Sequence, residues 1–362
     1  MVGVLWYKTV RVYVTTVLWF FFRKWQVNGE RNIPKNVPII FVVNHQNAFQ
    51  DAILIACSTK DEPWFLTRAG VFNNRFVRAI LTSFHMLPVY RFRDGVKGLR
   101  NNDITFRACI DLLSARKSIL VFGEGDQAMR YQLRALQKGF ARIALTTLQE
   151  NDWKQPLYIV PVGVQYDHYY HFRSRVLVNY GKAIPLDESF RSLSEREFYD
   201  AVLEKTKAGL LPLMVHIEAD NYEAIEAYLQ QNRNKKDLVE QLKEDQAVVA
   251  NWKVQPLKAV KKPVNYFSLL AALPLHLYVW INNFLPYSII SWLLKKFVTR
   301  EFKGSLKVGF GMVIVPFFYL LQTVLVQMTF SDWRVTLAYA ITLPFLSVWS
   351  VDVYKSAMNC KQ

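Results

Sequence analysis

Three uncharged runs near the C-terminus constrain this 362-residue chain more than any other feature. Residues 263–294 carry no charged side chain over 32 positions, residues 308–331 none over 24, and residues 335–351 none over 17. A helix that crosses a bilayer needs about 20 largely apolar residues. The sequence therefore predicts two spanning helices, at 308–331 and 335–352, joined by a tight turn. Prolines and paired asparagines within 263–294 instead favour a re-entrant hairpin whose two ends lie on the same side of the membrane.

The charge balance indicates whether this apolar chain binds a membrane or a nucleic acid. Lysine and arginine number 45 against 29 acidic residues, which gives a net charge of +16. Aromatic residues make up 15% of the chain, and rings mixed with basic side chains suit the headgroup layer of a membrane. The basic residues flank the apolar runs rather than form one continuous stripe, which disfavours a nucleic-acid partner. We therefore expect an integral membrane protein in contact with anionic lipids, with both ends of the C-terminal helix pair in the cytoplasm.

Composition divides the rest of the chain into three regions. Residues 1–35 contain an uncharged run too short to span a bilayer, flanked by basic residues, which predicts a helix lying in the membrane interface. Residues 36–195 alternate short apolar runs with stretches of helical spacing, which predicts an α/β layer fold. Residues 196–262 are charged and rich in helix formers, which predicts surface helices or a helical insertion. The membrane region then fills residues 263–362.

The runs of strand length and the stretches of helical spacing have definite limits. The expected strands are 38–43, 64–67, 86–90, 118–122, 157–164 and 176–180, and the expected helices include 104–114 and 140–148.

A polar loop, Asn-His-Gln-Asn-Ala-Phe-Gln-Asp, directly follows the expected strand 38–43. Reactive groups of α/β folds often lie in such loops. His45 is suited to accept a proton near neutral pH, and Asp51 can hold the second ring nitrogen. Six positions apart, the two residues cannot share one face of a continuous helix, so we expect a loop to fold His45 back over a first helical turn that carries Asp51. On these two residues alone, a capping aspartate and an ordinary surface histidine remain the simpler interpretation.

Two further motifs also follow expected strands. A Gly-Glu-Gly-Asp turn comes after 118–122, where the glycines allow close approach of a ligand and Glu124 can accept hydrogen bonds from a polyol. Arg91 follows 86–90 and is suited to grip a phosphate, and Arg134 and Lys138 add positive charge after the glycine turn. Taken singly, each motif is equally consistent with a plain turn or a surface cation. The cysteine spacing and the remaining histidines support no metal site.

The order and spacing of these motifs resemble the four blocks of the glycerolipid acyltransferase family, which acylates glycerol-3-phosphate and lysophosphatidic acid. The resemblance covers residues 40–165 and implies a mixed central sheet flanked by helices. It implies that His45 is the general base and that Asp51 orients it. It also implies that Arg91 binds the phosphate of the acceptor.

The third and fourth blocks carry further implied roles. The resemblance implies that Glu124 and Gly125 help to bind the acceptor, and that the apolar segment 159–163 contributes to binding the acyl donor. The chain departs from the usual pattern in having five residues between its histidine and aspartate where four are common, as some fungal glycerol-3-phosphate acyltransferases do. It also has Gly123 where proline is usual, and Asp126 where threonine or serine is usual.

The resemblance implies a membrane-bound O-acyltransferase. Such an enzyme would move a fatty acyl group from acyl-CoA or acyl-carrier protein to a hydroxyl of glycerol-3-phosphate or lysophosphatidic acid, with its active site on the cytoplasmic face and no cofactor beyond the donor. Two alternatives stay open. One is an O-acyltransferase acting on a lyso-aminolipid, whose amine would face Asp126, and the other is a membrane scaffold that binds lipid without chemistry.

Overall fold

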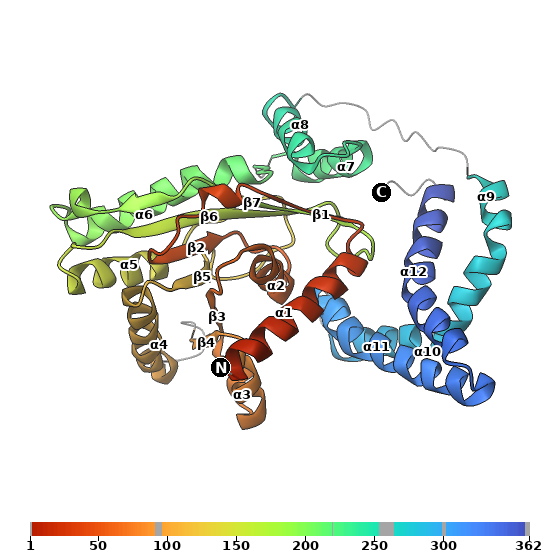
Figure 1. The fold of residues 1–362 in the computed structure, drawn as a ribbon. Coiled ribbons are helices and arrows are strands. Elements are labelled where there is room, and N and C mark those ends of the chain that lie inside the picture. The colour runs from red at the N-terminus through yellow and green to blue at the C-terminus, as the bar shows by residue number, and fades with distance from the viewer. Residues whose placement is uncertain (1, 91–95, 219, 253–263, 299–301, 359–362) are drawn as a thin grey trace.

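A mixed sheet forms the centre of the α/β part of the protein, and α9 to α12 lie to one side of it (Figure 1). The computed structural model describes residues 2–90, 96–218, 220–252, 264–298 and 302–358. Within them the eight strands run in the order β1-β7-β6-β2-β5-β3-β4, with β8 paired to β6. Neighbours are parallel, except that β6 is antiparallel to β7 and β8. The strands are β1 (Lys24–Asn28), β2 (Ile39–Val43), β3 (Trp64–Arg68), β4 (Met86–Val89), β5 (Ser118–Phe122), β6 (Leu157–Tyr166), β7 (Arg175–Tyr180) and β8 (Ile184–Leu186).

Helices cover both faces of this sheet. Phe41 and Val43 of β2 pack in a core shared with α2, whereas Ile40 and Val42 pack in a second core shared with α4, α5 and α6. A strand buried on both faces needs an unbroken apolar sequence, which β2 has. The α/β fold with a mixed central sheet is confirmed. The helices are α1 (Val2–Phe21), α2 (Ala48–Ser58), α3 (Arg75–Ser83), α4 (Val96–Ser114), α5 (Gly139–Glu150), α6 (Glu195–Leu210), α7 (Tyr222–Asn232), α8 (Leu238–Ala250), α9 (Tyr266–Ala271), α10 (Leu273–Phe297), α11 (Lys303–Phe330) and α12 (Trp333–Ala357).

The sheet begins earlier in the chain than the sequence predicted. β1 pairs in parallel with β7 and lies inside the segment 1–35 that we assigned to a membrane-interface region. Four of its five residues are half-buried, as suits an edge strand, and its mixed sequence Lys-Trp-Gln-Val-Asn carries no clear alternation. The α/β region therefore starts near residue 24, not at 36, and only α1 remains for an interfacial role.

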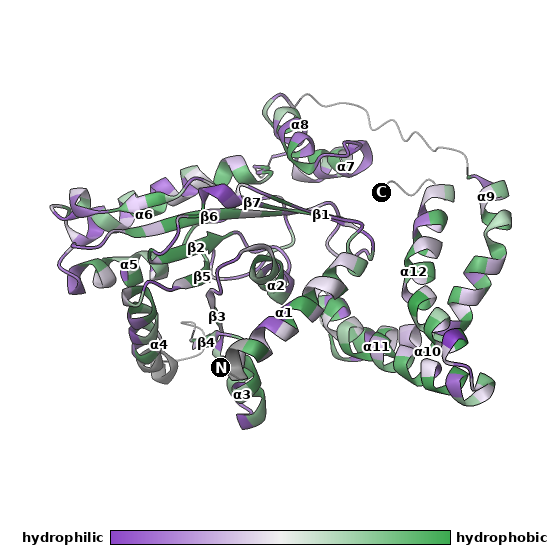
Figure 2. Ribbon diagram, in the orientation of Figure 1, coloured by the Kyte–Doolittle hydropathy of each residue, from purple (hydrophilic) through white to green (hydrophobic). Residues whose placement is uncertain are grey.

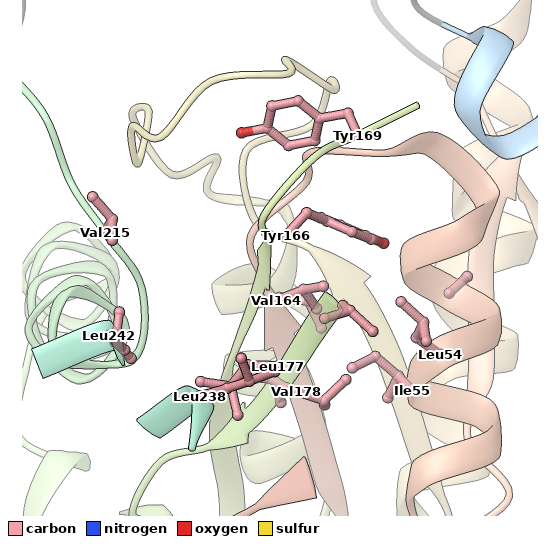
Figure 3. Close-up of a cluster of buried hydrophobic side chains, with 14 of the residues drawn as sticks. Leu54, Ile55, Val164, Tyr166, Tyr169, Leu177, Val178, Val215, Leu238 and Leu242 are labelled. Atoms are coloured by element: carbon pink, nitrogen blue, oxygen red, sulfur yellow. The ribbon is translucent and has the colours of Figure 1, made fainter. Parts of the chain in front are cut away.

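The charged region 196–262 is also more deeply packed than a set of surface helices. Phe198 and Val202 of α6 are buried in the second core. Figure 3 shows Leu242 of α8 and Leu54 of α2 on opposite sides of β6 and β7. The charges that dominate the composition lie on the outer helix faces, because only one face of each helix is needed for the core.

Two charged side chains of this region, those of Arg233 and Asp245, are themselves buried. Arg233 follows α7, and its side chain is only 4% exposed. Its Nε lies 2.7 Å from Oδ2 of Asp245 on α8, and its Nη1 donates to the hydroxyl of Tyr131 at 2.8 Å. Its Nη1 also donates to the backbone carbonyl of Tyr166 at 3.3 Å, so this guanidinium ties the α7–α8 pair to the end of β6.

Replacing this buried arginine gives a direct test of that anchor. Arg233→Met should lower the free energy of unfolding by about 3–5 kcal/mol, because it leaves Asp245 as a buried charge without its partner. Thermal unfolding of the full chain in detergent measures the change. Arg196→Met is the control, since Arg196 is 89% exposed and lies 3.9 Å from Asp200. Equal effects of the two substitutions would contradict the anchor.

Two C-terminal helices are long and apolar enough to cross a membrane, as the sequence predicted. These are α11, with 28 residues, and α12, with 25. Only 6% and 11% of their most apolar windows are buried within the described protein. Figure 2 shows that much of the sequence of both helices is hydrophobic. The tight turn between them contains Ser331, whose φ of 53° ends α11 in the left-handed conformation.

The prediction of a re-entrant hairpin over 263–294 is wrong. α10 continues as one helix through Pro286, where the hairpin would have to turn. Proline lacks the N–H that would bond the carbonyl four residues earlier, which is that of Asn282. Gln322 of α11 donates to this carbonyl at 2.7 Å. In α11, Pro316 similarly frees the carbonyl of Met312, to which the hydroxyl of Tyr13 on α1 donates. Side chains of neighbouring helices thus replace the missing backbone bonds.

Candidate active site

The loop after β2 brings His45 and Asp51 together as the sequence predicted. β2 ends at Val43, α2 begins at Ala48, and Asp51 lies in the first turn of α2. The loop turns back so that Nδ1 of His45 lies 2.9 Å from Oδ2 of Asp51. The side chain of His45 is 12% exposed, whereas that of Asp51 is fully buried.

The carboxylate of Asp51 accepts four hydrogen bonds. Oδ2 accepts from His45 and from the backbone N–H groups of Gln46 and Asn47, at 2.9 and 2.8 Å. Oδ1 accepts from the hydroxyl of Tyr166 at 2.7 Å. Burial, followed by the charge of Asp51, raises the pKa of Tyr166 well above its usual value, so this hydroxyl keeps its proton and donates.

This arrangement selects one tautomer of His45. Asp51 is the acceptor, so Nδ1 carries the ring hydrogen and Nε2 keeps its lone pair. The imidazole also stacks on Phe122, the last residue of β5, with ring centroids 3.7 Å apart and an angle of 13°. Phe122 therefore holds one face of the imidazole, and Asp51 holds its Nδ1. Chemically, Nε2 can accept a proton from a group bound beside it, and Asp51 can stabilise the resulting cation.

Glu124 joins this loop to the turn after β5. β2 and β5 are parallel neighbours, so their carboxyl ends meet at one edge of the sheet. Oε1 of Glu124 accepts from the backbone N–H of His45 at 3.0 Å, and Oε2 accepts from Nε of Arg134 at 2.7 Å. The Glu124 side chain is 2% exposed. The role of Glu124 in acceptor binding stays a prediction. The hydrogen bonds that the structure shows connect the loop after β2 to the segment after β5.

Glycine suits positions 123 and 125 of the turn for two different geometric reasons. Gly125 has a φ of +73°, which is the left-handed region that glycine adopts without strain. Gly123 donates its backbone N–H to the carbonyl of Val43 at 3.1 Å. A proline at this position would lose that bond, and an added Cβ would lie 2.8 Å from a side-chain carbon of Val42. The glycine at position 123 therefore permits a hydrogen bond between the two segments that proline could not make.

The predicted basic residues fall into three positions. Arg134 lies at the site, where its side chain is 33% exposed and also donates to the backbone carbonyl of Asp126. Lys138 lies at the start of α5, 60% exposed, with its Nζ 3.9 Å from Asp200 of α6. Arg91 lies outside the described residues.

Two supporting residues were not found from the sequence. One is Tyr166, the last residue of β6. The other is Asn44, a fully buried side chain that bonds both the N–H and the carbonyl of Val164, at 2.7 and 3.1 Å. Its position beside His45 was visible in the sequence, but its partner lies 120 positions away. No local pattern could have paired Tyr166 with Asp51.

Removing the Tyr166 hydroxyl tests the support of Asp51. Tyr166→Phe should lower the free energy of unfolding by about 1.5–3 kcal/mol, because a buried carboxylate oxygen loses its donor. Tyr199→Phe is the matched control, since that hydroxyl donates to Glu195, which is exposed on α6. Thermal unfolding of both variants measures the difference. A Tyr166→Phe variant as stable as the control would refute the proposed support.

Comparison with known proteins identifies the domain that holds this site. Residues 24–165 match the family model described as Acyltransferase. The matched range begins with β1, ends in β6 and includes His45, Asp51 and Glu124.

The chain carries an acyltransferase-family domain. The family expected from the sequence motifs is confirmed for this part of the chain.

Two yeast proteins are similar to part of this chain. It is 31% identical over 113 residues to glycerol-3-phosphate O-acyltransferase 2 of Saccharomyces cerevisiae, covering 30% of this chain and 15% of that protein. It is 32% identical over 111 residues to an uncharacterized acyltransferase of Schizosaccharomyces pombe, covering 30% of this chain and 16% of the relative. The matches thus span less than a fifth of either relative. The crystal structure of the 1-acyl-sn-glycerophosphate acyltransferase PlsC from Thermotoga maritima shares 22% identity at a TM-score of 0.40, covering 56% of this chain and 77% of PlsC.

Proposed function

We propose that this protein transfers a fatty acyl group from a thioester donor, acyl-CoA or acyl-carrier protein, to a hydroxyl of glycerol-3-phosphate or lysophosphatidic acid. The observation that carries the proposal is the His45–Asp51 pair, at 2.9 Å, inside an acyltransferase-family domain. The partial similarity to a yeast glycerol-3-phosphate O-acyltransferase supports this class of acceptor.

The chemistry follows from the orientation of His45. The acceptor hydroxyl binds beside Nε2, which takes its proton as the oxygen attacks the thioester carbonyl. A carbon–oxygen bond forms, and the carbonyl becomes a tetrahedral oxyanion. The oxyanion collapses, the carbon–sulfur bond breaks, and the thiol leaves with the proton that His45 returns. Asp51 stabilises the imidazolium between these two proton transfers.

Direct attack by the acceptor needs no nucleophile from the protein. Within the described residues, the two cysteines are unsuited to form an acyl-enzyme. Burial raises the pKa of the Cys109 thiol to about 12 and also raises that of Cys57. Both thiols therefore stay protonated near neutral pH, and the thiol form is a poor nucleophile.

Contacts between the site and α11 support a reaction at the membrane surface. Gly304, in the first turn of α11, packs so closely on the loop after His45 that an added Cβ would lie 2.8 Å from the side-chain oxygen of Asn47. A candidate spanning helix thus begins beside the proposed base. Basic residues at that end of α11 and in the last turn of α12 support a site on the cytoplasmic face. A lysophosphatidic acid acceptor and its product would then stay in the bilayer, whereas glycerol-3-phosphate would reach the site from the water.

A panel assay tests the reaction itself. Purified protein in lipid vesicles receives glycerol-3-phosphate, lysophosphatidic acid or a lyso-aminolipid, each with acyl-CoA or acyl-carrier protein, and thiol release is followed. We expect release with a phosphorylated acceptor and its loss in His45→Asn, with the variant still in the membrane fraction. Release only with the lyso-aminolipid would redirect the substrate class, and lipid binding without thiol release would indicate a scaffold.

Arg134 provides a test of the phosphate on the acceptor. Arg134→Gln should raise KM for glycerol-3-phosphate by roughly tenfold or more, because the charge-assisted hydrogen bond between the guanidinium and the phosphate of the acceptor is lost. KM for the thioester donor should stay the same. Arg191→Gln is the control, because Arg191 is exposed and pairs with Asp152 away from this loop. An unchanged KM for the acceptor would show that Arg134 does not bind its phosphate.

A further inference from the structure

Helix α3 is amphipathic, yet none of its residues is buried in the described protein. Phe76 is 74% exposed, and Val77 and Ile80 are each 38% exposed. The helix is nevertheless well defined, because the side chain of Asn74 accepts hydrogen bonds from the N–H groups of Phe76 and Val77. A helix of this kind normally packs its apolar face against a core. Here that face is open.

The charges around α3 indicate which kind of surface covers its apolar face. Arg75 and Arg78 lie on the helix itself, and residues 63–93 contain no aspartate or glutamate. The N-terminal residues 1–29 also lack acidic side chains and include Lys8. Asp61 and Glu62 lie near Arg11 and Tyr7 of α1, but both segments themselves carry only basic charges. Apolar segments with an excess of basic side chains complement an anionic lipid layer.

The exposed face of α3 is continuous with α1. The indole of Trp6 donates to the hydroxyl of Ser83 at 3.3 Å and stacks on Phe84 with centroids 6.1 Å apart. Trp6 is 49% exposed and Leu5 is 69% exposed, so apolar side chains continue along α1. Figure 1 shows α3 beside the N-terminal end of α1.

α1 in turn reaches a candidate membrane-spanning helix. The hydroxyl of Tyr13 donates to the carbonyl of Met312 in α11. One connected surface therefore runs from α3 through α1 to α11. A lipid bilayer contacts such a surface along its whole length, whereas a soluble protein partner would have to compete with the membrane around α11.

We propose that α3, together with Leu5 and Trp6 of α1, inserts its apolar face into the headgroup layer of an anionic bilayer. An interfacial helix buries its apolar face about 5–10 Å into that layer. β4 begins at Met86, three positions after the end of α3. The bilayer contact would thus hold β4 near the lipid surface.

The test places a fluorescent probe on α3 of the full chain. Cys57, Cys109 and Cys360 are replaced by alanine, and an NBD probe is attached at Phe76→Cys or, as the control, at Arg196→Cys on α6. The protein is reconstituted in vesicles of phosphatidylglycerol and phosphatidylcholine whose acyl chains carry bromine. We expect bromine to quench most of the fluorescence at position 76 and little at 196, and aqueous iodide to show the reverse pattern. The readout does not depend on acyl transfer.

Two results would overturn this proposal. Equal access of iodide to both probes would show that α3 faces water. A blue-shifted probe at position 76 without bromine quenching would show that a protein, and not lipid, covers the helix. The charge argument has its own test, in which Arg75→Gln with Arg78→Gln should reduce bromine quenching at position 76.

Discussion

The buried carboxylate of Asp51 is the interaction on which the proposed chemistry depends. Its four hydrogen bonds come from the histidine ring, two backbone amides of the same loop and Tyr166. A buried anion with fewer donors would be costly, so the loop, the first turn of α2 and the end of β6 stabilise one another through it. The orientation of His45 is a consequence of this network. Glu124 then fastens the same loop to the turn after β5, where a second set of predicted binding residues lies.

The sheet was largely predictable, for a physical reason that also explains its exceptions. β2, β5 and β6 are buried on both faces and therefore appear as nearly continuous apolar runs. β1 lies at the edge and has a mixed sequence, and β8 has three residues, so neither was found. The pairing of His45 with Asp51 was predictable because only a short loop and the first turn of α2 separate them. The contribution of Tyr166 was not, because 115 positions separate it from Asp51 and only the order of the strands brings them together.

The membrane region shows how tertiary contacts override local signals. Pro286 and the two preceding asparagines favour a broken helix, yet the carbonyl that proline leaves unpaired is bonded by Gln322. The carbonyl freed by Pro316 is bonded by Tyr13 in the same way. These donors come from other helices, so the sequence around each proline cannot reveal them. The same contacts connect α1, α10 and α11 into the unit that meets the acyltransferase-family domain beside His45.

Chemical rescue of the His45→Ala variant tests the central claim most directly. The variant leaves a space the size of the ring, and added imidazole can supply the missing base while pyrazole has nearly the same shape and almost no basicity. The account predicts that acyl transfer is lost in the variant, returns in part with imidazole and does not return with pyrazole. Transfer at the wild-type rate without any addition, or equal rescue by pyrazole, would contradict the role of His45 as the base.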